Sequence, residues 1–364
     1  MGDIKVGDTV TSRDGSATTV TGVYPQGFKN IVRVNFSDGV CVECCSEHLW
    51  SVSTDRAQSW TTMPTSQISH FFAKFPTTLN SFEIPLVSPV EFSPLTTPLV
   101  DPYLFGLVLG ALTAYQNSSE FDESDILPLA LENWSDFKFY ESVLPKGILL
   151  PPSSLSLPNL NHQLCTGFHW RDLKSILSLA CSSSKTTPRE LSIPLSFLRA
   201  SIPSRLALLR GFCDSSAHCD RSNCVSKLHI CSPSPSFSVS MVELIQSLGG
   251  TASRIFDLRP GKELLDLRLP LNPFSLPRKV RLFEKLSSEL RPQRFISSVT
   301  MLREDPCVCI SVSAKDCLYI TDHFVVTHNT IQAIAATAMY QPEWPVLVFT
   351  PSSARYHWKV LSYL

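Results

Sequence analysis

Three consecutive residues near the C-terminal end, His328, Asn329 and Thr330, carry side chains that can break and re-form a peptide bond. The amide nitrogen of an asparagine side chain can attack the carbonyl carbon of its own residue, and because this ring closure is intramolecular, effective molarity replaces catalytic power. A neighbouring histidine can donate or relay the proton as the C–N bond breaks. A threonine hydroxyl is a nucleophile once it is aligned and deprotonated. A His-Asn-Thr triplet alone does not identify a reactive site, so the function of these residues must be inferred from the elements around them.

The triplet lies at an abrupt change of local pattern. Residues 317–320 and 324–326 are apolar and β-branched or aromatic, and a polar turn separates them, which predicts two short strands. Residues 331–336 are alanine-rich and predict the start of a helix. The sequence therefore places the three reactive residues directly between a strand and a helix, without loop residues.

The rest of the chain divides into segments of different pattern, which predicts an α+β protein. Residues 1–52 are rich in strands, with turns at 14–15, 25–27 and 37–39, and residues 53–100 are a connecting region rich in Ser, Thr and Pro. The segments 101–116 and 204–216 are apolar and predict two buried helices with glycines at their contact. Mixed elements follow at 225–290, short strands at 307–326, and a β/α pattern after residue 330.

Composition excludes some classes of protein. The chain has 364 residues, 43% hydrophobic and 17% charged, which is enough for two or three domains with cores. The formal net charge of −1 provides no global basic field for nucleic acid. No apolar run reaches the length of a membrane span, and no signal peptide is recognisable. We therefore expect an intracellular protein that is not in a membrane, with twelve reduced cysteines.

Two cysteine clusters leave zinc binding open as an alternative. The first, Cys41-x2-Cys44-Cys45-x2-His48, has the spacing of half a zinc site. The second contains four cysteines at irregular spacings, near two histidines: Cys213, Cys219, Cys224, Cys231, His218 and His229. Because the first cluster lacks a second pair and the second is irregular, we favour ordinary packing of these thiols and expect no metal site.

Three stretches together resemble the splicing (Hint) domain of an intein: "IKVGDTV" (4–10), "GVYPQGFKNIVRVNFSDGVCVECCSEHLW" (22–50) and "CISVSAKDCLYITDHFVVTHN" (309–329). The resemblance implies an all-β splicing domain built from both ends, residues 1–95 and 295–329, in which the last strand brings Asn329 near His48. It also implies catalytic roles for Asn329, His328 and Thr330, without a cofactor.

The chain departs from the intein pattern at several positions. His48 matches the histidine that activates the upstream bond, but Cys45 replaces the usual threonine. Cys309 matches a position often held by aspartate, and Cys317 one often held by histidine. The initiating Cys or Ser of the family is expected upstream of "IKVGD" and is not found there. We therefore expect an incomplete intein that performs slow cleavage before Thr330 rather than full splicing.

The middle of the chain resembles a LAGLIDADG homing endonuclease. "LFGLVLGAL" (104–112) and "LRGFCDSSA" (209–217) match its two helices, and "SLGG" (247–250) and "RLPLNPFSLPRK" (268–279) match its downstream part, so residues 96–294 are the expected domain. In the family one carboxylate at the end of each helix holds Mg²⁺. Here Ala111 and Ser216 occupy these positions, and Asp214 lies two residues earlier. The resemblance implies a nuclease fold that no longer binds Mg²⁺ or cuts DNA.

Binding of double-stranded DNA to this domain remains an expectation, because a basic stretch with two interleaved phenylalanines could contact phosphates. A solvated helix face is an equally good interpretation. The stretch consists of Arg268, Arg278, Lys279, Arg281, Lys285, Arg291, Arg294, Phe283 and Phe295.

The segment 330–364, "TIQAIAATAMYQPEWPVLVFTPSSARYHW" and beyond, resembles an SNF2-type ATPase just after its phosphate-binding loop. The resemblance implies that the intein interrupts this host, whose flanking segments act in cis. In the spliced host Thr330 would ligate Mg²⁺ beside the nucleotide. We expect a monomer, in the nucleus if the host is a eukaryotic helicase. The alternative is a zinc- or DNA-binding module fused to part of such an ATPase.

Overall fold

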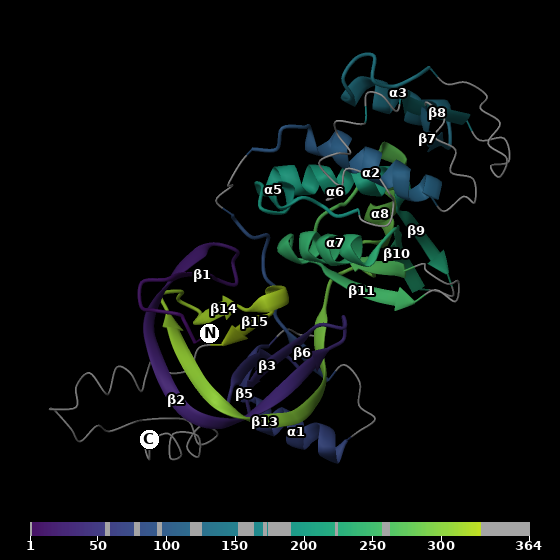
Figure 1. Cartoon of the computed structure of the whole chain (residues 1–364). Helices are drawn as coiled ribbons and strands as arrows, with labels where there is room; N and C mark the ends of the chain where they lie inside the picture. The colour runs from purple at the N-terminus through teal and green to yellow at the C-terminus, as the bar shows by residue number, and fades with distance from the viewer. Residues whose placement is uncertain are drawn as a thin grey trace, which may run out of the picture.

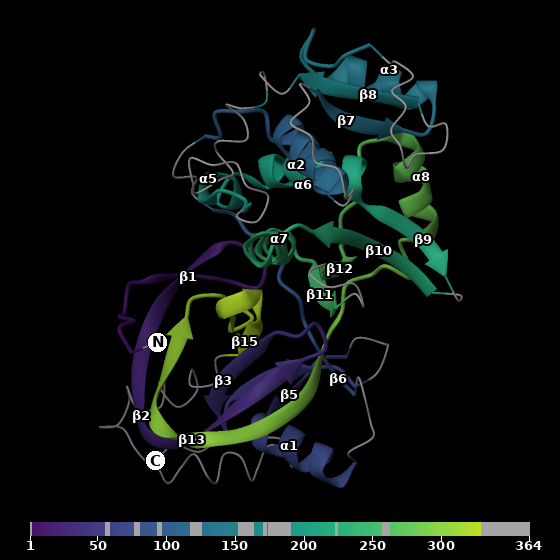
Figure 2. The ribbon, with the colours of Figure 1, turned by 45° about the vertical axis from the view of Figure 1, so that its right-hand side comes forward.

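A computed structural model describes residues 2–54, 59–75, 81–92, 97–116, 126–151, 164–169, 173, 191–222, 225–256 and 263–328. Strands from the two ends of this part of the chain form one sheet. β2 (Ala17–Phe36) and β13 (Arg294–Val312) pair antiparallel along almost their whole length, from Phe36 opposite Ile296 to Val20 opposite Val312. Figures 1 and 2 show both strands as long curved bands. The predicted α+β class is confirmed.

The curvature of this pair comes from irregular pairing, which bends a strand and increases its twist. Four register shifts interrupt the ladder, and at one of them Cys307 faces Gly27 while the next residue, Val308, faces Pro25. Gly27 has φ +67°, a left-handed conformation that glycine adopts without steric penalty. The prediction of a turn at 25–27 is therefore wrong, because this segment continues β2 as a bulge that pairs with β13.

Shorter strands complete the sheet. β1 (Thr9–Thr11) and β3 (Cys41–Cys45) both pair with β2, and β6 (Phe82–Ile84) pairs with the start of β13. Two hairpins lie beside it, β4 (Leu49–Val52) with β5 (Thr61–Pro64) and β14 (Leu318–Ile320) with β15 (Val326–His328). In both views β15 lies inside the curve made by β2 and β13 (Figures 1 and 2).

Alternation of apolar residues explains how this β-rich part folds. Along β2 the side chains of Val32, Val34 and Phe36 are buried on one face while Arg33 is exposed on the other. They pack with apolar residues from β4, β6, β13 and α1 (Thr65–Lys74). These partners are Trp50, Val52, Ile68, Phe82, Ile84 and Ile296. Residues from the two ends of the described chain thus share one core.

The middle of the chain forms a second core around two helices, α2 (Pro102–Gln116) and α6 (Ile202–Ser216). The predicted contact through glycines is confirmed. A Cβ on Gly106 would meet the carbonyl oxygen of Leu208, and a Cβ on Gly211 would meet that of Tyr103. Backbones this close leave no room for a side chain at either position.

A sheet and several further helices surround the pair. Its strand order is β11 (Thr251–Phe256), β12 (Glu263–Arg268), β10 (Val225–Ser232) and β9 (His218–Ser222), all antiparallel. The helices are α3 (Trp134–Val143), α5 (Leu195–Leu198), α7 (Pro235–Ser247) and α8 (Pro277–Leu286), and a small hairpin is made by β7 (Ile126–Leu131) and β8 (Leu164–His169). In the described part of the chain no helix has the length and apolar character needed to cross a membrane.

Candidate functional site

The backbone of His48 is fixed at the corner between β3 and β4. Its N–H donates to the carbonyl oxygen of Cys45 (3.1 Å), and its own carbonyl accepts from both the N–H and the hydroxyl of Thr65 (2.9 Å each). The Trp50 indole N–H donates to the same Thr65 hydroxyl (3.0 Å). Because Trp50 is fully buried, this network holds the histidine in a defined position.

The imidazole of His48 reaches the last described strand. Its Nε2 is hydrogen-bonded to the hydroxyl of Thr327 in β15, and its ring packs edge-on against Trp50, with centroids 5.0 Å apart. Burial lowers the pKa of His48 to about 4, and the positive charge of His328 nearby adds to this shift. His48 is therefore a neutral imidazole at neutral pH, able to accept one proton and donate another.

The structure brings His328 to the same place. His328 ends β15, where it pairs with Leu318 of β14, and it directly follows Thr327, whose hydroxyl is hydrogen-bonded to His48. Asn329 and Thr330 follow immediately but lie outside the described residues. Two of the residues predicted from the sequence, His48 and His328, thus lie together although they come from opposite ends of the chain.

The two cysteines among the expected catalytic residues are Cys45, which ends β3, and Cys309, which lies in β13 opposite Tyr24. Burial raises the pKa of the Tyr319 hydroxyl, and Cys309, Cys44 and Cys45 add to this shift. Burial raises the pKa of Cys309 to about 11 and that of Cys44 to about 12. Both groups are therefore neutral thiols at pH 7, and neither is a ready nucleophile without a base.

Sequence reasoning missed two members of this group, Thr327 and Trp50. A signal was present for each. Thr327 is a polar residue that directly precedes the His-Asn pair in an otherwise apolar strand, and Trp50 lies two positions after His48. Neither pattern reveals its partner, because the contacts of both residues are made across the fold.

The two positions at which the resemblance leads us to expect carboxylates, Ala111 and Ser216, lie at the contact of α2 with α6. Ala111 is buried, and Ser216 donates its hydroxyl hydrogen to the carbonyl oxygen of Phe212 (2.9 Å). Ser216 Oγ lies 3.1 Å from the point that a Cβ on Gly110 would occupy. The two positions therefore adjoin, but a methyl group and an internally bonded hydroxyl supply no negative charge for a divalent cation.

The carboxylate oxygens of Asp214 are used in hydrogen bonds inside the fold. They accept from the backbone N–H groups of Ser275 and Leu276 (3.1–3.2 Å), just before α8 begins, and from the hydroxyl of Tyr103 (2.8 Å). Burial nevertheless raises the pKa of Asp214 above its ordinary value. A carboxylate at a helix N-terminus satisfies free N–H groups and interacts favourably with the helix dipole.

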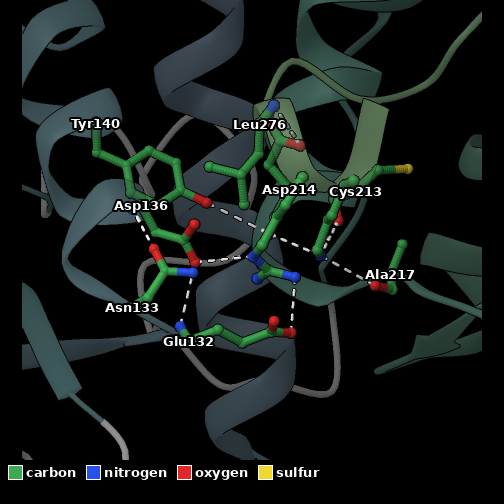
Figure 3. Close-up of polar contacts among 10 residues, drawn as sticks. Glu132, Asn133, Asp136, Tyr140, Cys213, Asp214, Ala217 and Leu276 are labelled. Atoms are coloured by element: carbon green, nitrogen blue, oxygen red, sulfur yellow. Dashed lines mark hydrogen bonds and ion pairs between the residues drawn. The ribbon is translucent and has the colours of Figure 1, made fainter. Parts of the chain in front are cut away.

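Lys279 of α8 contacts the C-terminal end of α6, the helix that carries Asp214. Its ammonium donates to the carbonyl oxygens of Cys213, Asp214 and Ala217 (2.8–3.1 Å) at the C-terminal end of α6. Figure 3 shows this region beside Tyr140, whose hydroxyl donates to the Asp214 carbonyl (3.4 Å). Burial lowers the pKa of Lys279 to about 8. Each helix thus supplies the charged group that caps the other.

Much of the predicted basic stretch is used in internal contacts rather than presented to a phosphate backbone. Arg278 pairs with Glu132 (2.6 Å) and Asp136 (2.9 Å), and Arg294 is buried against Asp38 (2.8 Å). Phe283 is buried in the helical core. Arg278, Lys279 and Arg294 are therefore engaged inside the fold and are not available to contact phosphates. Arg281 and Lys285 on α8 remain exposed.

Among the described residues, no group of three or more His, Cys, Asp or Glu side chains could hold a metal ion. Cys41 is exposed, away from the partly buried Cys44 and Cys45. In the second cluster, Cys224 lies outside the described residues. His218 and His229 stack across β9 and β10, with ring centroids 5.6 Å apart. The geometry therefore gives no support to the zinc alternative.

Comparison with known proteins adds little. No protein-family model matches the chain, and no curated protein matches its sequence. Among solved structures, a homing endonuclease is similar, from a study of mesophilic variants of I-DmoI. The similarity has a TM-score of 0.30 at 12% identity and covers 52% of this chain and 94% of that chain. At this TM-score the likeness carries no argument about function.

Proposed function

We propose that this chain is an intein-type autoprocessing element that cleaves itself between Asn329 and Thr330. The observation that carries the proposal is the contact of His48 with Thr327, beside His328. It brings His48 to the strand whose last residue, His328, directly precedes Asn329 in the sequence. The pairing of β2 with β13, from opposite ends of the described chain, produces this contact and supports a splicing domain composed of residues 1–95 and 295–329.

The proposed reaction is ring closure at Asn329. The side-chain amide nitrogen attacks the carbonyl carbon of the same residue and loses a proton, while the C–N bond to Thr330 breaks and the departing nitrogen gains one. The products are a C-terminal succinimide and a free amine on Thr330. A group that both accepts and donates a proton is needed, and a neutral imidazole does both. His328 is the adjacent candidate, and the Thr327 hydroxyl orients His48 beside it.

The remaining site residues have subsidiary roles in the proposal. Thr330 supplies the hydroxyl that would accept an upstream host segment, and Cys45 and Cys309 are proposed auxiliary groups of that exchange. No cofactor takes part in these steps. The host segment 330–364 remains a proposed SNF2-type fragment, in which Thr330 would bind Mg²⁺ and nucleotide only after splicing.

We further propose that residues 96–294 are a homing-endonuclease-like domain that keeps its helix pair and has lost its nuclease chemistry. The close contact at Gly106 and Gly211 supports the helix pair. The neutral residues Ala111 and Ser216, and the internal use of Asp214, argue against a Mg²⁺ site. Double-stranded DNA remains a proposed partner of this domain, through cations other than Arg278, Lys279 and Arg294.

Release of the segment that begins at Thr330 tests the proposal. We expect the purified wild-type chain to lose this segment slowly at neutral pH, whereas Asn329→Ala stays intact because no side-chain amide remains to attack. His328→Ala is expected to slow release by roughly 10²–10⁴-fold, the range for a general acid or base. Equal persistence of wild-type and Asn329→Ala chains over days would overturn the proposal.

A further inference from the structure

The hydroxyl of Thr65, the first residue of α1, is the meeting point of three contacts around His48. It donates to the His48 carbonyl (2.9 Å), accepts from the Trp50 indole N–H (3.0 Å) and lies 3.6 Å from Sγ of Cys44. A hydroxyl has one hydrogen and two lone pairs, so after the first two contacts one lone pair remains, and the Cys44 thiol is the donor to it. The hydrogen-bonding capacity of this one oxygen is therefore filled by residues of β3, β4 and the corner between them.

The start of α1 is docked in a way that keeps this hydroxyl in place. The Thr65 N–H donates to the His48 carbonyl (2.9 Å), and the N–H of Ser66 donates to the carbonyl of Ser46 (2.8 Å). Thr65 is buried, and Ile68, one turn further along the helix, is buried in the core of the β-rich part. A fixed backbone therefore presents the hydroxyl to the corner that carries His48.

The same oxygen restrains His48 at two points, its main chain and its ring. The main chain is held through the hydrogen bond from Thr65 to the His48 carbonyl. The ring is held through Trp50, which packs edge-on against the imidazole (interplanar angle 71°) and also against Phe36 (70°). Because the buried indole cannot turn without losing its bond to Thr65, the imidazole keeps the position in which it reaches Thr327.

We propose that Thr65 is a positioning residue for cleavage at Asn329, acting through the main chain and the ring of His48. The assignment rests on the proposed function, in which His48 contacts Thr327 in the strand that leads to Asn329. Thr65 exchanges no proton with the reacting atoms, and its hydroxyl sets where Nε2 of His48 lies. Misplacement of a reacting group by about 1 Å can cost about 10²-fold in rate, so the loss of this hydroxyl has a measurable kinetic effect in a folded chain.

Two substitutions separate the hydroxyl from the rest of the Thr65 side chain. Thr65→Val keeps the shape and removes the oxygen, whereas Thr65→Ser keeps the oxygen and removes a methyl group. We expect Thr65→Val to slow release of the segment that begins at Thr330 by about 10–100-fold, and Thr65→Ser to retain most of the wild-type rate. Thr113→Val is the matched control and should leave the rate unchanged, because it removes a buried hydroxyl that is bonded to the Leu109 carbonyl (2.8 Å) in α2.

A second readout does not depend on cleavage. NMR titration of the full chain, carrying Asn329→Ala so that it stays intact, gives the pKa of His48, which burial lowers to about 4. Adding Thr65→Val should raise this pKa toward the ordinary value of 6.5, because a loosened imidazole is better hydrated, and adding Thr113→Val should leave it unchanged. If the wild type does not release its C-terminal segment, the proposed cleavage fails, and this titration still decides whether Thr65 positions His48.

Thr65→Val leaves the buried Trp50 indole without its acceptor and could prevent folding. The double variant Trp50→Phe, Thr65→Val removes donor and acceptor together, which can be nearly neutral for stability, and it still lacks the hydroxyl. It should show the same slow release and raised His48 pKa. An unchanged pKa of His48 would overturn the assignment, and so would release at the wild-type rate by a folded variant without the hydroxyl. Equal slowing by Thr65→Ser and Thr65→Val would also overturn it, since the hydroxyl would then not be the group responsible.

Discussion

His48 and Thr327 are separated by 279 positions in the sequence and are joined by a hydrogen bond between their side chains. The bond crosses from the corner after β3 to the last strand of the described chain. It forms because β2 and β13 bring the two ends of the chain into one sheet. One contact therefore links the assembly of the β-rich part to the position of β15, the last described strand.

The lowered pKa of His48 predicts a dependence of stability on pH. In the unfolded chain His48 binds a proton near its ordinary pKa of 6.5, while in the folded chain it stays neutral down to about pH 4. The contribution of His48 to stability is therefore complete above pH 6.5 and is lost as the pH falls toward 4. At about 1.4 kcal/mol per pKa unit, the loss between pH 7 and pH 4.5 is on the order of 2–3 kcal/mol. Thermal unfolding at pH 7 and pH 4.5 measures it.

His48→Gln is the matched control for this titration, because an amide can hydrogen-bond Thr327 but does not bind a proton. Its unfolding temperature should fall less than that of the wild type over the same pH interval. An identical fall in both proteins would show that His48 is not the titrating group.

The buried ion pair of Arg294 with Asp38 predicts a large effect of removing one partner. Both side chains are almost fully buried, and the guanidinium also holds the Phe324 carbonyl. Asp38→Ala leaves an uncompensated buried charge and should lower the free energy of unfolding by about 3–5 kcal/mol. Chemical denaturation measures this. The double variant Asp38→Ala, Arg294→Met should recover part of the loss, and a fully additive double variant would contradict the account.

The closeness of α2 and α6 predicts that neither contact glycine tolerates a methyl group. A Cβ on Gly106 would meet the Leu208 carbonyl oxygen and would come within 2.9 Å of the Phe212 backbone nitrogen. Gly106→Ala and Gly211→Ala should each destabilise the chain by about 1–3 kcal/mol or more, because the helices must separate. Gly2→Ala, where a Cβ meets nothing within 4 Å, should have no effect on the denaturation midpoint.

The internal use of Asp214 predicts that the chain does not cut DNA. Incubation with Mg²⁺ and a plasmid carrying the uninterrupted host site should leave the plasmid intact, and Mg²⁺ should not raise the unfolding temperature. Asp214→Asn should lower stability by about 1–3 kcal/mol, since the backbone N–H groups before α8 lose a charged acceptor. Specific cleavage by the wild type that Asp214→Asn abolishes would show instead that Asp214 holds a catalytic metal.

The local pattern of the sequence was sufficient for several elements. The apolar segments with glycines predicted α2, α6 and their contact, and the alternation near residue 320 predicted the hairpin of β14 with β15. These predictions succeed because the period of apolar residues is a local property that burial of one face imposes.

Long-range contacts account for what the sequence did not predict. We expected only short strands from residue 307, whereas β13 already begins at Arg294. A single sequence predicts that an arginine lies at the surface, but Arg294 is buried because Asp38 neutralises its charge. The roles of Asp214 and Lys279 as caps of each other's helices were missed for the same reason. A charged residue in a single sequence reveals neither its burial nor its partner.

The measurement that tests the central claim most directly is the mass of the large product of wild-type cleavage. If Asn329 closes onto its own carbonyl, the product that ends at residue 329 carries a succinimide and is one water lighter than the chain ending in a free carboxylate, to which it slowly hydrolyses. The released segment must begin with Thr330. A large product that carries a free carboxylate from the earliest time point, or a break at any other bond, would contradict the account, because simple hydrolysis would then explain the cleavage.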